Sequence, residues 1–177
     1  MKALVTGASS GIGRDMARYL SKLGYDLVIV ARRENLLQEL KKDLNTNVEI
    51  EVLDISIKEN CYTLFEKHKD IDLLVNNAGF GVFGEFTETD LEQELSLIDT
   101  NIKSLHILTK LYAKAMKEKD NGKILNVASI AGFMTGPLMA SYYASKNYVV
   151  SLSSAINKEL KKANRGYKIC KISKNML

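Results

Sequence analysis

Cysteine and proline are scarce in this chain and tryptophan is absent, with two, one and none among 177 residues. Cys61 and Cys170 are far apart, and only His68 and His106 offer further soft ligands for a metal. This scarcity argues against a disulfide-rich framework and against a zinc site built on paired cysteines, so we expect no bound metal. Such cysteine usage is typical of a reducing compartment, and we expect a cytoplasmic location.

Long apolar runs and a one-sided charge are also missing. No stretch approaches the ~20 apolar residues that span a bilayer, and Gly7 comes too early for a signal peptide, so no membrane partner is expected. The 25 Lys and Arg stand against 21 Asp and Glu, which leaves a net charge of only +4. Most lysines lie on helix-like stretches such as residues 110–117, which indicates a solvated face, and no nucleic-acid partner is expected.

Short β-branched runs alternate with longer amphipathic runs throughout the chain, which predicts parallel βαβ units with right-handed crossovers. Residues 1–177 are expected to form a single α/β domain with a doubly wound, Rossmann-like parallel sheet of strand order 3-2-1-4-5-6. The strands are predicted at residues 2–6, 26–31, 48–53, 71–75, 123–128 and 167–172. The helices are predicted at residues 12–23, 34–44, 57–69, 90–117 and 141–163.

A glycine-rich segment separates the first predicted strand from the first predicted helix. Glycine lets the backbone turn sharply and approach a pyrophosphate closely, while a helix start offers free N–H groups and the positive end of its dipole. The spacing G-x-x-x-G-x-G differs from the common G-x-G-x-x-G, and a turn without a ligand is the alternative. The residues predicted to hold a dinucleotide here are Thr6, Gly7, Ser9, Ser10, Gly11, Ile12 and Gly13.

Two arginines follow the second predicted strand, where the residue that contacts the adenosine ribose is expected. An acidic residue there would accept a hydrogen bond from a ribose 2′-hydroxyl, but the chain has Arg32 and Arg33 and no acid before Glu34. A guanidinium group pairs with a phosphate through two charge-assisted hydrogen bonds. The sequence therefore favours NADPH over NADH, with an arginine on an exposed turn as the alternative.

Tyr142 and Lys146 are four residues apart at the start of a predicted helix and so share one face. A phenol with a pKa near 10 is a poor acid–base catalyst at neutral pH, and an ammonium about 4 Å away lowers such a pKa by at most roughly three units. Tyr143 is three residues from Lys146, so the spacing does not choose between the two tyrosines. Plain packing beside a solvated lysine is a further alternative.

Four ordered motifs resemble those of the short-chain dehydrogenase/reductase family over nearly the whole chain. They are T-G-x-x-x-G-x-G from Thr6, N-N-A-G from Asn76, the serine at Ser129, and Tyr142-x-x-x-Lys146. The resemblance implies hydride transfer between a nicotinamide and a carbonyl or alcohol, with Tyr142, not Tyr143, as the proton donor. It also implies that Ser129 holds the substrate oxygen and that Lys146 binds the nicotinamide ribose and assists Tyr142.

The same resemblance assigns further residues around the cofactor. Asn101 matches an asparagine that anchors a proton-relay water, and Asp54, followed by Ile55, matches an aspartate that contacts the adenine. Asn77, Ala78 and Gly79 match the segment beside the cofactor. Two alternatives rest on the residues themselves, namely that Asn101 bends the long helix and that Ser129 caps a strand end.

Apolar residues on the loops beyond the strand ends predict an apolar pocket for a small carbonyl or alcohol substrate, although half of them could equally be loop anchors. They are Phe80, Val82, Phe83, Phe86, Phe133, Met134, Leu138 and Met139. A second apolar stripe predicts either a homodimer interface or core. It consists of Leu105, Leu108, Leu111, Tyr112 and Ala115.

Family members continue beyond the sixth strand with a Pro-Gly turn, a substrate-covering segment, a helix and a seventh strand. Lys174-Asn175 stands where Pro-Gly would be, and the only proline is Pro137. We therefore expect a truncated copy that lacks the seventh strand and leaves the sixth as an open edge. The alternative to an active enzyme is a catalytically silent remnant that binds a nucleotide or dimerises.

Overall fold

The computed structural model describes residues 1–162 and 168–172, and their strands form one parallel sheet with the order β3-β2-β1-β4-β5-β6. The predicted strand order and the doubly wound α/β class are confirmed. Lys174 and Asn175 lie outside the described residues. The strands are β1 (Lys2–Thr6), β2 (Asp26–Ala31), β3 (Val48–Val52), β4 (Leu73–Asn76), β5 (Lys123–Val127) and β6 (Lys168–Ile172).

The helices follow the predicted order, with bounds that differ by a few residues. One difference is substantial, because the helix predicted at residues 90–117 contains a turn of π-helix. The helical segments are α1 (Gly11–Lys22), α2 (Glu34–Lys42), α3 (Lys58–Lys67), α4 (Leu91–Ile98), the π-helix η1 (Asp99–Ser104), α5 (Leu105–Lys119), the 3₁₀ turn η2 (Ile130–Phe133) and α6 (Ala140–Lys162).

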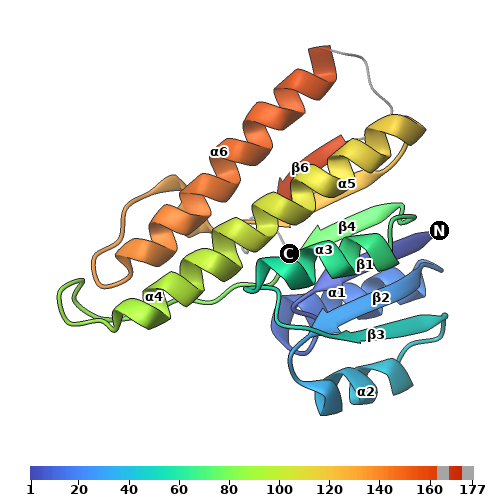
Figure 1. Ribbon diagram of the computed structural model, residues 1–177, viewed down its shortest axis with the longest axis horizontal. Coiled ribbons are helices and arrows are strands. Elements are labelled where there is room, and N and C mark those ends of the chain that lie inside the picture. The colour runs from blue at the N-terminus through green and yellow to red at the C-terminus, as the bar shows by residue number, and fades with distance from the viewer. Residues whose placement is uncertain (163–167, 173–177) are drawn as a thin grey trace.

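Helices cover the sheet from both sides (Figure 1), and the two faces of β2 show why the strands are continuously apolar. Leu27 and Ile29 pack with α1 and α2, whereas Val28 and Val30 pack with α3, α5 and α6. Successive side chains of a strand point to opposite faces, so both sets must be apolar when both faces are covered. No described helix is long and apolar enough to cross a bilayer.

The apolar stripe of the long helix belongs largely to the core. Leu108 and Tyr112 are fully buried and Leu105 nearly so, while Leu111 and Ala115 are half-buried. The dimer-interface interpretation is therefore wrong for Leu105, Leu108 and Tyr112. Their spacing of three, four and seven residues places them on the helix face that packs on the sheet.

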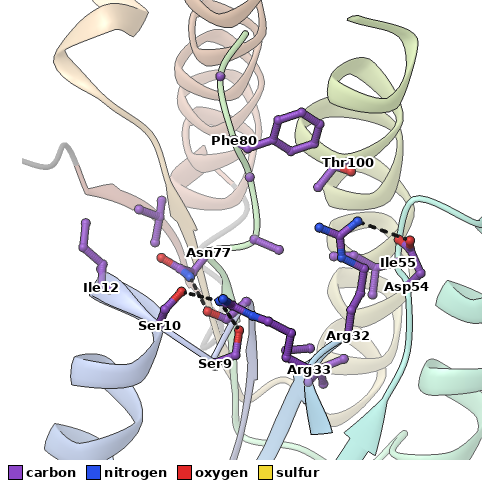
Figure 2. A pocket seen from close by; sticks show the side chains of 18 of the residues that line it. Ser9, Ser10, Ile12, Arg32, Arg33, Asp54, Ile55, Asn77, Phe80 and Thr100 are labelled. Carbon is purple, nitrogen blue, oxygen red and sulfur yellow. Dashed lines mark hydrogen bonds and ion pairs between the residues drawn. The ribbon is translucent and has the colours of Figure 1, made fainter. Parts of the chain in front are cut away.

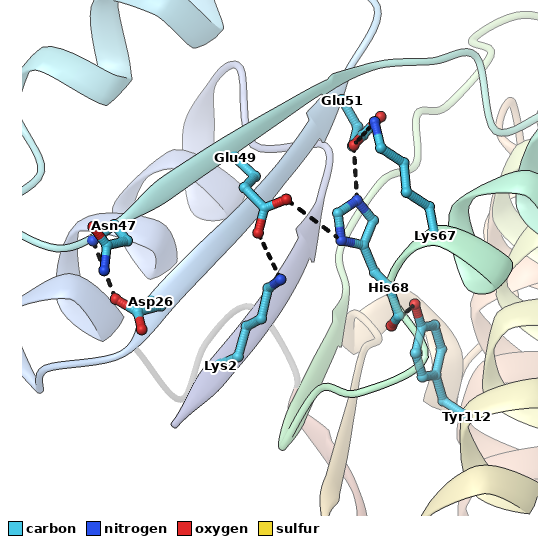
Figure 3. Close-up of polar contacts among 8 residues, drawn as sticks. All are labelled: Lys2, Asp26, Asn47, Glu49, Glu51, Lys67, His68 and Tyr112. Carbon is cyan, nitrogen blue, oxygen red and sulfur yellow. Dashed lines mark hydrogen bonds and ion pairs between the residues drawn. The ribbon is translucent and has the colours of Figure 1, made fainter.

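A group of charged residues, which we call the β3–α3 cluster, joins the edge strand β3 to the end of α3 (Figure 3). It consists of Lys2, Glu49, Glu51, Lys67 and His68. Lys2 Nζ lies 2.6 Å from Glu49 Oε1, and Lys67 Nζ lies 2.6 Å from Glu51 Oε1. His68 Nε2 lies 2.7 Å from Glu51 Oε1, and its Nδ1 lies 3.9 Å from Glu49 Oε2. These interactions hold an edge strand to the rest of the sheet.

Both carboxylates of the cluster are stabilised in their charged form. The hydrogen bond from Lys2 is the main reason why the pKa of Glu49 is below its ordinary value. Burial raises the pKa of Glu51, but the hydrogen bonds from Lys67 and His68 outweigh burial and leave that pKa lowered as well. The cluster therefore contributes to folding stability when its acids are ionised.

Candidate active site

A cleft of about 750 Å³ lies beyond the carboxyl ends of the parallel strands (Figure 2). Its walls come from the segments that follow β1 to β5 and from the first turns of α6. In doubly wound sheets, ligands bind outside the carboxyl ends of the strands, where the strand order reverses. The cleft is therefore in the place where the fold itself predicts a binding site.

Most of the predicted site residues line this cleft. They are Gly7, Ser9, Ser10, Gly11, Ile12, Arg32, Arg33, Asp54, Ile55, Asn77, Ala78, Gly79, Tyr142 and Lys146. The other four lie behind the lining and are buried. They are Thr6, Gly13, Asn101 and Ser129.

Several lining residues were not predicted from the sequence, among them Asp15, Gly81, Thr100, Val127 and Ala128. Val127 and Ala128 end the predicted fifth strand, so their position at a strand's carboxyl end was a usable signal. Asp15 and Thr100 carry no comparable signal, because their exposure to the cleft depends on how α1 and η1 are rotated.

The glycine-rich segment is shaped by close packing as well as by backbone conformation. Gly7 has a φ of +67°, and a Cβ there would lie 2.8 Å from the Ala78 Cα. A Cβ on Gly13 would lie 2.3 Å from the Gly7 carbonyl oxygen, so Gly13 allows α1 to pack against the loop rather than facing the cleft. Only glycine satisfies both positions without displacing the backbone.

The start of α1 is suited to an anion. Ser10 occupies the N-cap position, but its side chain makes no capping hydrogen bond, and the first turn of this fully described helix contains no acidic residue. The first N–H groups of this helix and its positive dipole end are therefore neither capped by that side chain nor neutralised by an acid in the first turn. This arrangement fits the pyrophosphate of a dinucleotide.

Thr6 supports the cleft from behind by joining β1 to the segment after β4. Its Oγ1 accepts hydrogen bonds from the N–H groups of Asn77 (3.0 Å) and Ala78 (3.2 Å) and donates to the Val75 carbonyl at 3.3 Å. The Asn77 side chain donates to the Thr6 carbonyl at 3.1 Å. Asn77 and Ala78 are thereby held at the floor of the cleft.

The two predicted phosphate-binding arginines make different contacts (Figure 2). Arg33 Nη2 donates to Ser9 Oγ at 3.1 Å and to Ser10 Oγ at 2.9 Å, so its guanidinium group lies over the glycine-rich segment. Arg32 Nη1 lies 3.6 Å from Asp54 Oδ2. Sequence spacing treats the arginines as equivalent, but only Arg33 is anchored at the start of α1.

Asp54 is held on its own loop. Burial raises the pKa of this carboxyl group, but hydrogen bonds from the Ser56 hydroxyl and backbone, followed by the Arg32 charge, leave the pKa lowered overall. Its Oδ1 accepts from the Ser56 hydroxyl at 2.7 Å and from the Ser56 N–H at 3.0 Å. Asp54 is therefore a charged residue with a fixed orientation at the cleft.

Lys146 is a buried amine at the inner wall of the cleft. It is only 5% exposed, and its Nζ donates to the Val127 carbonyl at 3.0 Å. Burial lowers the pKa of Lys146 to about 8. The same Nζ lies 5.9 Å from the centre of the Tyr142 ring. Lys146 and Tyr142 are thus neighbours in the cleft, at a distance measured to the ring rather than to the hydroxyl.

The structure separates the two neighbouring tyrosines, which the sequence spacing left equivalent. Tyr142 lines the cleft with Lys146. Tyr143 lines a second hollow of about 540 Å³, where it packs closely on Gly136. Adjacent residues of a helix point about 100° apart, so only one of the two side chains can face the cleft.

Ser129 and Asn101 each make local hydrogen bonds that differ from the alternatives predicted for them, a strand-end cap and a helix bend. Ser129 Oγ accepts from the Ala131 N–H at 3.2 Å and caps η2 directly after β5. Asn101 lies in the π-helix η1, and its carboxamide forms hydrogen bonds with both backbone groups of Phe80, at 3.0 and 2.9 Å. π-Helical turns inside α-helices frequently mark functional sites.

The predicted apolar residues divide into two groups. Phe80 and Met139 line the cleft itself. Most of the others are exposed, and Val82 is half-buried. The exposed ones are Phe83, Phe86, Phe133, Met134 and Leu138.

Comparisons with known proteins agree with the sheet and the cleft. A family model described as short chain dehydrogenase matches residues 1–171. An uncharacterized oxidoreductase of Staphylococcus epidermidis is 36% identical over 180 residues, which cover 99% of this chain and 77% of that protein. The 3-oxoacyl-acyl-carrier-protein reductase of Rickettsia prowazekii is 36% identical over 167 residues, 93% of this chain and 67% of that protein.

Solved structures show the same similarity. Serine dehydrogenase from Escherichia coli superposes with a TM-score of 0.88 at 30% identity, covering 98% of this chain and 82% of that one. A metagenomic short-chain oxidoreductase in complex with NADP superposes with a TM-score of 0.88 at 29% identity, covering 97% of this chain and 81% of that one. The chain therefore belongs to the short-chain dehydrogenase/reductase family, a class of oxidoreductases with a nicotinamide cofactor, as the four motifs predicted.

Proposed function

We propose that this protein is an NADPH-dependent oxidoreductase that interconverts a carbonyl and an alcohol. One observation carries the proposal: Tyr142 and Lys146 line the same cleft as the glycine-rich segment and Arg33. A proton donor beside a dinucleotide-binding loop is the arrangement that hydride transfer needs, because the nicotinamide and the substrate then bind next to each other and next to the proton donor. The bound cofactor supplies the hydride.

Tyr142 is proposed to donate the proton to the substrate oxygen as negative charge develops there. Lys146, with a pKa of about 8, is mostly protonated at neutral pH, and its charge lies in a partly desolvated wall where electrostatic interactions are strong. The cation favours the ionised phenol and so assists Tyr142 as it transfers a proton to the substrate oxygen. Lys146 is also the candidate for holding the nicotinamide ribose hydroxyls.

Ser129 is proposed to donate a hydrogen bond to the same substrate oxygen. Its Oγ accepts from the Ala131 N–H, so its own proton remains available for donation. A hydroxyl fixed in this way stabilises developing charge without reorganising during the reaction. Asn101 is proposed to anchor a relay water from η1, where its side chain is held by Phe80.

The preference for NADPH is proposed to come from Arg33 more than from Arg32. Arg33 is anchored by Ser9 and Ser10 at the start of α1, while Arg32 is next to Asp54. The Arg33 guanidinium and the hydroxyls of Ser9 and Ser10 form a pocket rim in which a 2′-phosphate receives hydrogen bonds from all three groups. Asp54 and Ile55 are proposed to contact the adenine.

The substrate is proposed to be a small, mostly apolar carbonyl or alcohol. Phe80 and Met139 line the cleft, and exposed apolar residues are close to them in the sequence. These are Phe83 and Phe86 after Phe80, and Phe133, Met134 and Leu138 before Met139. A homodimer in the cytoplasm is also proposed. The exposed apolar residues Leu91, Leu95 and Ile98 of α4 are better candidates for a subunit interface than the buried stripe of α5.

The experiment that tests the proposed function measures NADPH oxidation by the purified protein with a panel of apolar aldehydes and ketones. We expect turnover by the wild type and by Tyr143→Phe, and a loss of about 10²- to 10⁴-fold in kcat for Tyr142→Phe, the range typical of general acid catalysis. NADPH binding without turnover by the wild type would instead support the catalytically silent remnant. A failure of NADPH to raise the melting temperature would contradict both.

A further inference from the structure

A serine lies inside the Tyr142-x-x-x-Lys146 motif, and neither the sequence motifs nor the proposed chemistry uses it. Ser145 is fully buried (0% exposed) on the face of α6 that packs toward η1. Its Oγ donates to the Tyr142 carbonyl at 2.7 Å and accepts from Asn101 Nδ2 at 3.0 Å. One hydroxyl therefore makes both of its strongest hydrogen bonds with residues of the proposed site.

The Asn101 carboxamide has no freedom to move away from this serine. Its Oδ1 accepts from the Phe80 N–H, and the two hydrogens of Nδ2 are directed to the Phe80 carbonyl and to Ser145 Oγ. The Gly79 backbone packs closely against this carboxamide, because a Cβ on residue 79 would lie only 2.8 Å from Asn101 Oδ1. Phe80, Asn101 and Ser145 thus form a bridge from the loop after β4, through η1, to α6.

The bridge ends on the backbone that connects the two proposed catalytic side chains. In an α-helix the Tyr142 carbonyl also accepts from the N–H of residue 146, so the Ser145 hydroxyl adds a second donor to the same oxygen. This oxygen is part of the helical turn that carries both Tyr142 and Lys146. Fixing it fixes the first turn of α6 relative to the loop of Phe80, which lines the same cleft and passes close to both side chains: a Cβ on Gly81 would lie 3.3 Å from the Tyr142 ring, and one on Gly79 would lie 3.5 Å from Lys146 Nζ.

We propose that Ser145 is a positioning residue: by bridging Asn101 to the Tyr142 carbonyl, it sets the position of the Tyr142 phenol and the Lys146 amine relative to the loop of Phe80. The inference rests on the proposed function, since it assigns a role in the same reaction. Misplacement of a reacting group by about 1 Å costs up to roughly 100-fold in rate, so a small shift of this turn is enough to be measured.

Ser153 provides a matched control on the same helix. It is 1% exposed, and its Oγ accepts from the side chain of an asparagine, Asn126, at 3.0 Å. Ser153 is two turns beyond Lys146 and contacts no residue of the cleft lining through this bond. Ser145→Ala and Ser153→Ala therefore remove the same chemical group from equally buried positions, each with an asparagine partner.

The test compares kcat, the KM for NADPH, the pH profile of kcat and the melting temperature of both variants with the wild type. We expect Ser145→Ala to lower kcat about tenfold, to leave the KM for NADPH within about twofold, and to shift the pH profile of kcat. Ser153→Ala should lower the melting temperature by a similar amount while its kcat and pH profile stay those of the wild type.

Two results would overturn the inference while leaving the proposed function intact. One is a Ser145→Ala variant whose kcat and pH profile equal those of the wild type, in the same assay in which the Tyr142→Phe variant is inactive. The other is an equal fall of kcat in both serine variants, which would make the effect one of general stability. A wild type without turnover would instead overturn the proposed function, and the positioning role with it.

Discussion

The cleft and the β3–α3 cluster each bury one basic side chain, but they surround it differently. Lys146 is 5% exposed, and its hydrogen-bond partner is an uncharged backbone carbonyl, Val127. His68 is 3% exposed and lies between the carboxylates of Glu49 and Glu51 (Figure 3). Burial without an opposite charge lowers the pKa of Lys146 to about 8.

This difference separates charges that serve folding from charges that serve chemistry. The carboxylates of the cluster are paired with Lys2, Lys67 and the His68 ring, which leaves little charge for a ligand. A buried amine beside an uncharged acceptor is costly for folding, and its position next to a phenol and a cleft gives it a reason to be retained. The comparison predicts that changes in the cleft affect activity first, and that changes in the cluster affect stability first.

The largest effect is expected from Lys146→Met. Removal of the cation beside Tyr142 should lower kcat by about 100-fold or more, because the phenol loses the charge that favours its ionised form. The same change should stabilise the free protein at pH 7, by at most on the order of 3 kcal/mol, since an apolar side chain replaces a buried amine. Steady-state kinetics and thermal unfolding check the two effects.

The stability gain of Lys146→Met depends on pH in a defined direction. The folded-state pKa of about 8 is below the ordinary value of 10.5, so the folded state binds fewer protons than the unfolded state in this interval. Wild-type stability therefore rises as the pH increases from about 8 to 10.5. The melting temperatures of variant and wild type should converge over that interval, and a constant difference would contradict the assignment.

A smaller effect is expected from the arginines at the rim of the cleft. Arg33→Ala should raise the KM for NADPH by about 10- to 100-fold, which corresponds to the loss of charged hydrogen bonds worth roughly 1.5–3 kcal/mol, and should leave the KM for NADH nearly unchanged. Arg32→Ala is the matched control and should have the weaker effect on NADPH. A larger effect for Arg32→Ala would show that the anchored guanidinium is not the main phosphate contact.

His68→Leu tests the other region. The variant loses the hydrogen bond between the His68 ring and Glu51, and we expect its free energy of unfolding to fall by about 1–3 kcal/mol. Urea denaturation measures this change. The kcat of the variant should stay at the wild-type value, and a fall in kcat without a fall in stability would break the contrast between the two regions.

The smallest effect is expected from Lys2→Met, because the Lys2–Glu49 pair is partly exposed and pairs of this kind contribute at most about 1 kcal/mol. The pKa of Glu49 is lowered mainly by the hydrogen bond from Lys2, so the contribution is present above the ordinary value of 4.5 and disappears as the pH falls through the folded-state pKa. Thermal unfolding between pH 3 and 7 should show a variant that is less stable than the wild type at pH 7, by a difference that shrinks as the pH falls below 4.5. Lys69→Met, which breaks a pair outside the cluster, is the control.

The sequence predicted the sheet and the contents of the cleft well because both depend on local signals. Buried strands are apolar on both faces, and the glycines of the segment from Gly7 to Gly13 report a backbone that must turn and pack closely. The carboxyl ends of parallel strands then bring their following residues together. This is why the glycine-rich segment and Arg33 could be assigned to one cleft, whereas Tyr142 was assigned to it from the resemblance to the short-chain dehydrogenase/reductase family.

The remaining features depend on contacts between distant segments. The π-helix η1 is not visible in the apolar period, because Asn101 acquires its partners Phe80 and Ser145 only after folding. Neighbouring residues of one element point in different directions, so their partners differ. This is why Arg32 and Arg33 make different contacts and why Tyr142 and Tyr143 line different hollows. The pairing of His68 with Glu49 and Glu51 joins residues that no local pattern connects.

The most direct test of the contrast between the two regions is an NMR titration of the lysine side chains in the free protein, with the Lys146 signal assigned from its loss in Lys146→Met. We expect Lys146 to titrate near pH 8, while Lys67, whose pKa is raised by its hydrogen bond to Glu51, titrates above its ordinary value of 10.5. A Lys146 signal that titrates at or above 10.5 would contradict the account, because the amine would then be solvated or paired like the charges of the β3–α3 cluster.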